Sequence, residues 1–254
     1  RRLLATLKHY VGHSFSEGGR NHAPVRIGER ELIDTLMLPF EMAVRLADAG
    51  SVMPAYHDLD GEPLHQSRHY LETVLRGQWS FDGIVVADYE GISQLHTDHR
   101  TQEELSGAAA AALTAGVDVE LPGDTVYRDG IREALEDGRL EPSLLDAAVR
   151  RVLLQKLRLG LFDHPYVPEE AIELTSEKHR ALARRAASES IVLLKNDGVL
   201  PLSPGSSIAL VGPLADEPLA MLNGYSFPVH LISARSRSSE VGLSTVREEL
   251  VRRG

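Results

Sequence analysis

Short apolar runs alternate with stretches of helical periodicity over most of the chain. Apolar runs bounded by polar or turn-forming residues predict β-strands, and they lie at 3–10, 51–56, 83–87 and 117–121. Apolar residues spaced three and four apart predict helices, and these patterns cover 31–49, 67–77, 102–115, 125–137 and 143–159. Strands that alternate with helices are typical of a parallel sheet. The chain is therefore predicted to contain about four strand–loop–helix units.

Local signals predict where some of these helices bend, end and begin. Pro39 lies inside the pattern at 31–49, which predicts a kink or two abutting helices. Gly50 is expected to end that pattern. Thr101 and Glu104 have the spacing of a capping box, which predicts the start of the alanine-rich helix at 102–115.

Four units are half of an eight-stranded barrel. The predicted fold class is therefore α/β, either half of a (β/α)8 barrel over 1–162 or an open doubly wound sheet. Beyond this region, a linker and a helix are predicted over 163–186. Apolar runs at 191–194 and 208–211 predict strands of an incomplete second α/β domain over 187–254. We expect the chain to be a piece of a larger protein, truncated at both ends.

The composition narrows the range of partners. The chain of 254 residues has a net charge of −10, which argues against nucleic acid or an anionic membrane surface as the main partner. It has no cysteine, which fits a reducing compartment, and we expect a cytoplasmic location. No apolar run approaches the roughly 18 residues that a membrane span needs. The histidines at 96 and 99 are interpreted as part of a solvated loop, so neither a metal nor a cofactor is expected.

Polar and aromatic residues stand at the ends of the predicted strands. These residues are Lys8 and His9, then Tyr56, His57 and Asp58, then Asp88 and Tyr89, then Glu120. If the strands are adjacent and parallel, these side chains line one face, where barrel enzymes place their active sites. Carboxylates, hydrogen-bond donors and an aromatic surface suit a polyhydroxylated substrate. By position alone, Asp88 is equally a nucleophile or a cap of the segment that follows.

Six stretches of the chain resemble family 3 glycoside hydrolases of the β-glucosidase and β-xylosidase type. They are KHY at 8–10, EGGRN at 17–21, SVMPAY at 51–56, FDGIVVADY at 81–89, GVDVELP at 116–122 and SIVLLKNDGVLPL at 190–202. They occur in the family's order and span most of the chain. The resemblance implies the C-terminal half of a TIM barrel followed by the start of an α/β sandwich domain.

The resemblance also implies roles for individual residues. Asp88 matches the family's catalytic nucleophile, at the end of the seventh barrel strand. The residues that match sugar-binding positions are Lys8, His9, Arg20, Tyr56 and Tyr89, the last standing where many members have tryptophan. The general acid of such enzymes is a glutamate far along the second domain, and no glutamate between 187 and 254 carries a matching motif. No general acid is therefore assigned in this chain.

The implied activity is that of a retaining, exo-acting β-glycosidase that forms a covalent glycosyl-aspartate. Its implied partners are small oligosaccharides or aryl and alkyl β-glycosides, with glucose and xylose both open. One alternative is a β-N-acetylglucosaminidase of the same family, in which His13 would be the mobile acid/base. Another is a non-catalytic carbohydrate-binding paralogue. The chain alone is expected to hydrolyse glycosides poorly or not at all.

Overall fold

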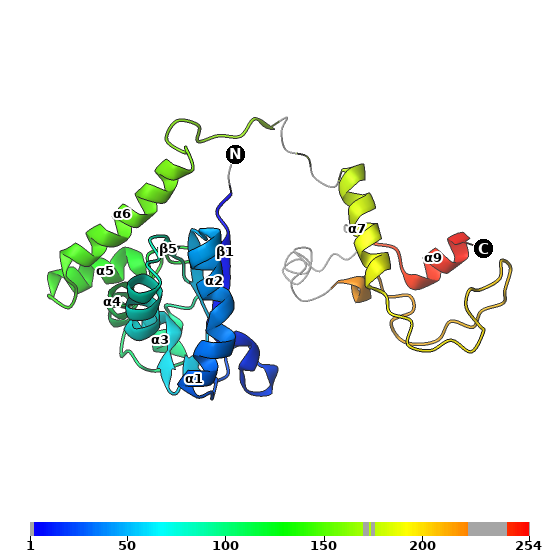
Figure 1. The fold of residues 1–254 in the computed structure, drawn as a ribbon, viewed down its shortest axis with the longest axis horizontal. Helices are drawn as coiled ribbons and strands as arrows, with labels where there is room; N and C mark the ends of the chain where they lie inside the picture. The colour runs from blue at the N-terminus through cyan, green and yellow to red at the C-terminus, as the bar shows by residue number, and fades with distance from the viewer. Residues whose placement is uncertain (1–2, 170–172, 174–175, 223–242, 254) are drawn as a thin grey trace. The chain divides into compact units, whose positions relative to one another are not determined.

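The computed structural model describes residues 3–169, 173, 176–222 and 243–253, and the chain divides into two units, 1–172 and 173–254 (Figure 1). Each unit is described by itself. Among the described residues, no helix combines the length and the apolar character needed to cross a bilayer.

A parallel sheet forms the centre of the first unit. Its strands are β1 (Thr6–Tyr10), β2 (Ser51–Pro54) and β5 (Ile84–Val85), hydrogen-bonded in that order. Thr6 lies opposite Ser51, and Ser51 lies opposite Ile84. The strands predicted at 3–10, 51–56 and 83–87 are thus confirmed. The run at 117–121 contributes only a parallel bridge between Val86 and Val119.

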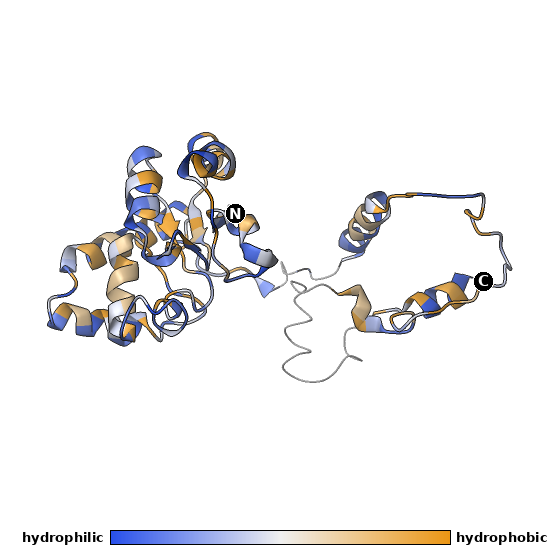
Figure 2. Ribbon diagram, turned by 90° about the horizontal axis from the view of Figure 1, so that it is seen from below, coloured by the Kyte–Doolittle hydropathy of each residue, from blue (hydrophilic) through white to orange (hydrophobic). Residues whose placement is uncertain are grey.

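Helices connect and cover these strands. Between β1 and β2 lie η1 (His13–Phe15), η2 (Glu17–Gly19), α1 (Glu29–Glu31), the π-helical η3 (Leu32–Met37) and α2 (Leu38–Ala47). Between β2 and β5 lie the hairpin of β3 (Asp58–Leu59) and β4 (Glu62–Pro63), the short η4 (Leu64–Gln66) and the π-helical η5 (His69–Gln78). After β5 come α3 (Gln94–Thr97), α4 (Leu105–Ala115), α5 (Tyr127–Glu136) and α6 (Pro142–Arg158). Both apolar and polar residues appear around these helices (Figure 2).

The helix containing Pro39 follows one local prediction and departs from another. The helical type changes at Leu38, so two segments abut as Pro39 predicts. The helix ends at Ala47, with Asp48 in the left-handed conformation at φ 52°, so Gly50 is not its end. Gly50 instead allows close packing, because a Cβ there would overlap the side chain of Leu4.

The predicted capping box at the start of α4 is wrong. The helix begins at Leu105, and neither predicted partner caps it. The Thr101 hydroxyl donates to Gln66 Oε1 at 2.9 Å, and Glu104 Oε1 accepts from Arg139 at 2.8 Å. Both side chains find partners more than thirty residues away in the sequence, which a local pattern does not predict.

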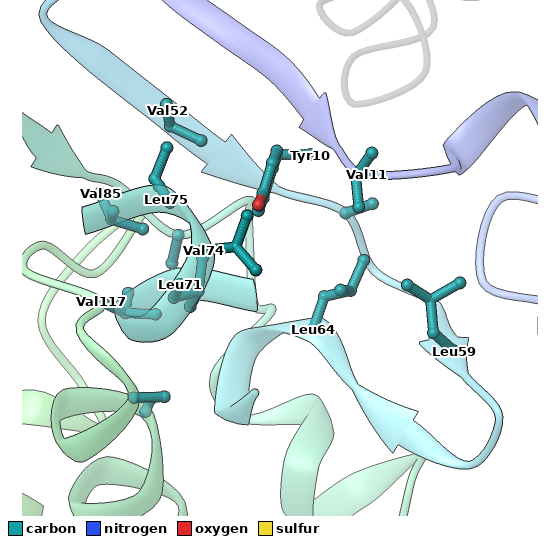
Figure 3. Close-up of a cluster of buried hydrophobic side chains, with 14 of the residues drawn as sticks. Tyr10, Val11, Val52, Leu59, Leu64, Leu71, Val74, Leu75, Val85 and Val117 are labelled. Carbon is teal, nitrogen blue, oxygen red and sulfur yellow. The ribbon is translucent and has the colours of Figure 1, made fainter. Parts of the chain in front are cut away.

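The core lies between the sheet and the helices that cover it. Figure 3 shows side chains from β1, β2 and β5 meeting those of η5. Tyr10 is fully buried, and its hydroxyl donates to the carbonyl oxygen of Tyr70 at 3.0 Å. The alanine face of α4 permits a close approach to α5, where a Cβ at Gly130 would lie 2.8 Å from the Cβ of Ala109. Small side chains therefore set the separation of these two helices.

The second unit contains helices and extended segments in its described part. Its helices are α7 (Glu177–Ser190), η7 (Pro218–Met221) and α9 (Val246–Arg253). The Ser176 hydroxyl caps α7 by accepting from the N–H of His179, which confirms the helix predicted here.

The strands predicted at 191–194 and 208–211 do not form. A strand is stable when a neighbour pairs its backbone N–H and C=O groups. No described residue pairs with either segment, and both expose apolar side chains such as Leu194 and Val211. Residues 223–242 of the predicted second domain lie outside the described residues.

Candidate active site

The carboxyl ends of the three parallel strands meet at one edge of the sheet. His9 lies in β1, Tyr56 follows β2, and Asp88 follows β5. The Ala55 N–H donates to the carbonyl oxygen of Tyr10 at 2.7 Å, which holds the ends of β1 and β2 together. Because parallel strands present their carboxyl ends on one side, residues from three distant segments converge here.

Asp88 is buried, and hydrogen-bond donors surround its carboxylate. His9 Nε2 lies 3.2 Å from Asp88 Oδ2, and the Tyr89 N–H donates to Asp88 Oδ1 at 2.8 Å. Burial acts to raise the pKa of Asp88, but hydrogen bonds from His9, the Tyr89 N–H and the Tyr56 hydroxyl outweigh it and lower the pKa to about 2. The group is therefore an ionised carboxylate at neutral pH.

Tyr56 connects the ends of β2 and β5. Its hydroxyl lies between the Asp88 carboxylate and the carbonyl oxygen of Tyr89, which it reaches at 2.8 Å. One hydroxyl proton serves one of these acceptors at a time. His99 Nε2 lies 2.8 Å from the Tyr56 carbonyl oxygen, and the ring of His22 lies 4.3 Å from the Tyr56 ring. Tyr56 is thus fixed on several sides beside the carboxylate.

The remaining predicted site residues are less closely joined to Asp88. Lys8 and Arg20 are exposed, and no described contact links either side chain to the carboxylate. Arg20 Nε donates to the carbonyl oxygen of Glu17 at 3.2 Å. The Tyr89 side chain is 59% exposed, although its backbone holds both Asp88 and Tyr56. The structure therefore brings His9, Tyr56 and Asp88 together. The side chains of Lys8, Arg20 and Tyr89 are exposed.

Two other strand-end carboxylates hold the backbone. Glu120 accepts from the N–H groups of Val126 and Tyr127 at 3.0 and 2.7 Å, which ties the extended run at 117–121 to the start of α5. Asp58 Oδ1 accepts from the Gly61 N–H at 2.9 Å in the turn between β3 and β4. These contacts occupy both carboxylates in local structure.

Two buried histidines lie at this edge, of which His57 is named among the strand-end residues of the sequence and His65 is missed. His57 is fully buried, and its Nε2 lies 3.0 Å from the Val11 carbonyl oxygen. His65 is also buried, and its Nε2 accepts from the Asp88 N–H at 3.2 Å. Burial lowers the pKa of both rings to about 4. His57 stands next to Tyr56 in the sequence, at a predicted strand end. His65 follows a turn, where exposed histidines also occur, so no sequence pattern distinguishes it.

The described residues contain no group of three or more His, Cys, Asp or Glu side chains that could hold a metal ion. Both histidines of the 96–99 stretch have a backbone partner. His96 Nδ1 lies 3.1 Å from the Gln102 carbonyl oxygen, and His99 contacts Tyr56 as described above.

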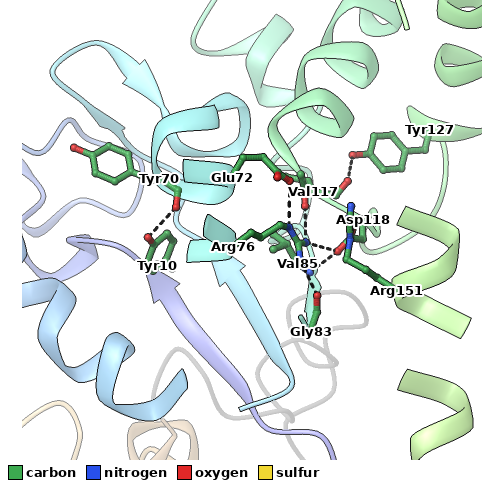
Figure 4. A network of polar contacts seen from close by, with 11 residues as sticks. Tyr10, Tyr70, Glu72, Arg76, Gly83, Val85, Val117, Asp118, Tyr127 and Arg151 are labelled. Atoms are coloured by element: carbon green, nitrogen blue, oxygen red, sulfur yellow. Dashed lines mark hydrogen bonds and ion pairs between the residues drawn. The ribbon is translucent and has the colours of Figure 1, made fainter. Parts of the chain in front are cut away.

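A second buried carboxylate lies near the amino ends of the strands. Asp118 Oδ2 accepts from Arg76 at 2.8 Å and from the Val85 N–H at 2.8 Å, and its Oδ1 accepts from Arg151 Nε at 2.8 Å (Figure 4). Arg76 also donates to the carbonyl oxygen of Gly83 at 3.0 Å. These contacts join β5, η5 and α6 at one point.

Parallel strand–helix units with a polar site at the carboxyl ends of the strands are typical of α/β domains, both TIM barrels and open doubly wound sheets. Residues 1–154 match the family model described as "Glycosyl hydrolase family 3 N terminal domain", and the chain belongs to this family. The family and the fold class inferred from the sequence are thereby confirmed, and the alternative of an open doubly wound sheet is set aside.

Proteins named β-xylosidase and proteins named β-glucosidase are both similar to this chain. A "Beta-xylosidase" of Formosa agariphila is 37% identical over 252 residues, which cover 91% of this chain and 34% of that protein. A "Periplasmic beta-glucosidase" of Salmonella typhimurium is 34% identical over 232 residues, covering 88% of this chain and 30% of that protein. The crystal structure of a β-glucosidase from Listeria innocua in complex with glucose superposes with a TM-score of 0.77 at 34% identity, over 85% of this chain and 30% of that one. The chain thus spans about one third of the length of these curated relatives.

Proposed function

We propose that this chain carries the nucleophile and part of the sugar-binding site of a retaining, exo-acting β-glycosidase. The observation that carries the proposal is the Asp88 carboxylate, ionised and held at the carboxyl edge of the sheet. Membership of glycosyl hydrolase family 3 and relatives named β-glucosidase and β-xylosidase support it.

In the proposed reaction, an Asp88 oxygen attacks the anomeric carbon of a terminal β-linked sugar. The bond to the leaving oxygen breaks as that oxygen takes a proton from a general acid, and a covalent glycosyl-aspartate forms. Water then attacks the same carbon and releases Asp88, so the configuration is retained. Because the pKa of Asp88 is about 2, the attacking group needs no base to ionise it.

The neighbouring side chains have complementary proposed roles. Lys8 and Arg20 donate charge-assisted hydrogen bonds to sugar hydroxyls, and His9, whose Nε2 contacts Asp88, accepts a hydrogen bond from a sugar hydroxyl at Nδ1. Tyr56 lies beside the nucleophile, and the exposed ring of Tyr89 offers a surface on which a sugar can stack. Hydrogen bonds that strengthen as the oxocarbenium-like state forms contribute to rate as well as binding.

The general acid is assigned to no residue of this chain. A retaining glycosidase needs a second carboxyl about 5 to 5.5 Å from the nucleophile. Of the other strand-end carboxylates, Asp58 and Glu120 hold backbone N–H groups instead. We therefore propose that the 254-residue chain alone hydrolyses glycosides poorly or not at all, and robust turnover of a nitrophenyl β-glycoside by it would contradict this.

Covalent labelling of the full-length protein tests the nucleophile. A 2-fluoro glycoside slows hydrolysis of the glycosyl-enzyme, so the label is expected on the peptide that contains Asp88. Glucosyl, xylosyl and N-acetylglucosaminyl nitrophenyl glycosides, assayed in parallel, separate the candidate substrates. A label on another residue would reject Asp88. Sugar binding without turnover or labelling would favour the non-catalytic alternative.

A further inference from the structure

The ring of His65 lies directly behind Asp88, on the backbone side. His65 belongs to η4 and is 1% exposed. Its Nε2 lies 3.2 Å from the backbone nitrogen of Asp88. A backbone N–H can only donate, so Nε2 must accept and the ring proton must lie on Nδ1. Ala55, directly after β2, makes a second backbone hydrogen bond with the ring, and Nδ1 is the nitrogen left to donate it. His65 therefore bridges the ends of β2 and β5.

The turn after Asp88 is shaped around this ring. The Gly91 N–H donates to the Asp88 carbonyl oxygen at 2.9 Å, which closes a turn over residues 88–91. A Cβ at Gly91 would overlap the His65 imidazole at Nε2 and Cε1. Position 91 therefore has no room for a side chain while the ring stays in place, and the ring and the turn determine each other's positions.

The environment of the ring favours its neutral form. Burial disfavours an imidazolium, and His57 and His99 act in the same direction, together outweighing the attraction of Asp88 and the hydrogen bond with the Ala55 backbone. A second ring proton on Nε2 would also point at the Asp88 N–H, so protonation and this contact are mutually exclusive.

We propose that His65 is a positioning residue that, as the neutral Nδ1–H tautomer, fixes the backbone of Asp88 and so aims its carboxylate into the site. The Asp88 carboxylate itself accepts a hydrogen bond from the Tyr89 N–H, and Tyr89 belongs to the same turn. His65 touches neither the carboxylate nor the proposed sugar position. Its effect on rate rests on the proposed function, whereas its tautomer and its contact do not.

Paired substitutions in the full-length protein separate positioning from general stability. His65→Gln places an amide oxygen near the position of Nε2 and keeps the acceptor, so kcat is expected within about 5-fold of wild type. His65→Asn is too short to reach the Asp88 N–H, and a misplacement of about 1 Å costs on the order of 10²-fold in kcat. KM is expected to change less than about 3-fold, because the hydroxyl-binding side chains stay in place. Gly91→Ala displaces the ring from the other side and is expected to resemble His65→Asn.

His57→Asn is the matched control. It makes the same change at a buried histidine of the same edge, which contacts the Val11 carbonyl and not Asp88. It is expected to lower thermal stability while kcat stays within about 3-fold of wild type. If His65→Asn also keeps kcat within that range, or changes KM instead of kcat, the positioning role is rejected.

The tautomer provides a readout that needs no activity. In protein labelled with ¹⁵N-histidine, the His65 resonances are assigned by their loss in His65→Gln. They are expected to show a protonated Nδ1 and an unprotonated Nε2 from pH 6 to pH 8. A proton on Nε2, or an imidazolium at pH 6, would overturn the inference even in an active enzyme. A wild-type protein that hydrolyses no glycoside would instead refute the proposed function, while the tautomer would still decide the contact of His65 with Asp88.

Discussion

Two aspartates lie toward opposite ends of the same parallel strands, and they are held in different ways. The Asp118 side chain is 0% exposed, and two guanidinium groups and a backbone N–H bind its oxygens. The Asp88 side chain is 12% exposed, and its partners are an imidazole, a phenol and a backbone N–H. One carboxylate is enclosed by cations, and the other keeps an accessible charge.

The difference shows how one domain assigns separate tasks to chemically identical groups. Arginines that neutralise Asp118 also tie together η5, β5 and α6, so this end of the strands contributes to stability. The donors around Asp88 lower its pKa without supplying a permanent cation that would compete with a substrate for its oxygens. Barrel enzymes divide stability and catalysis between the two ends of their strands in this way.

Asp88→Asn in the full-length protein is expected to have the largest effect. Loss of a nucleophile is expected to lower kcat by roughly 10⁴-fold, the scale seen when one residue of a hydrolase's catalytic unit is removed. Circular dichroism is expected to match wild type, because asparagine has nearly the same shape. Full activity in this variant would remove the distinction between the two aspartates.

Asp118→Ala is expected to destabilise the protein more than any other single change discussed here. It leaves the largely buried guanidinium of Arg76 and the partly exposed one of Arg151 without their shared counter-charge, and because Glu72 still pairs with Arg76 the cost is about 3 kcal/mol, the lower end of the range for a broken buried pair. Urea unfolding followed by tryptophan fluorescence measures this loss. The fraction that remains folded is expected to keep kcat within a few-fold of wild type, and a selective loss of kcat would place Asp118 in the catalytic site instead.

His9→Gln is expected to have an intermediate effect. It disturbs the 3.2 Å contact with Asp88 Oδ2, and a hydrogen bond to a charged group contributes about 1.5 to 3 kcal/mol. The corresponding loss in kcat/KM is about 10- to 10²-fold. His69→Gln is a suitable control, because its half-exposed ring lies near Glu29 and has no described contact with Asp88. An equal loss in both variants would show that the contact is unimportant.

The smallest expected effect is on the pH dependence of stability. The pKa of Asp88 is about 2 in the folded protein, below its ordinary value of 3.8, so its ionised form favours folding. That contribution is fully present above about pH 5 and is lost as the pH falls through 3.8 toward 2. The free energy of unfolding of wild type is expected to exceed that of Asp88→Asn by about 1 to 2 kcal/mol at neutral pH. A difference that stays constant down to pH 2 would contradict the lowered pKa.

The parts of this fold that follow from local patterns were predictable. Apolar runs marked the three strands of the sheet, and helical spacing marked α4, α5 and α6. The convergence of His9, Tyr56 and Asp88 followed from the parallel arrangement alone, because it places the carboxyl ends of strands together. Their roles in binding and catalysis stay predictions.

The features that were missed depend on contacts between distant residues. Thr101 and Glu104 had the spacing of a capping box, but Gln66 and Arg139 bind them instead. The runs at 191–194 and 208–211 have strand-like composition and no pairing partner among the described residues. His65 carried no signal, since its importance comes from a backbone N–H 23 residues away.

Gly83 lies so close to Gly50, at the amino ends of β5 and β2, that the spacing of these two strands limits which residues position 83 can accept. A Cβ at Gly83 would overlap the carbonyl oxygen of Gly50, so any side chain there forces β5 away from β2 at their amino ends. The strands are only two to four residues long, and the same displacement would separate Tyr56 from Asp88 at the other end. In a saturation library selected for activity, position 83 is expected to accept glycine alone, although it lies outside the candidate active site.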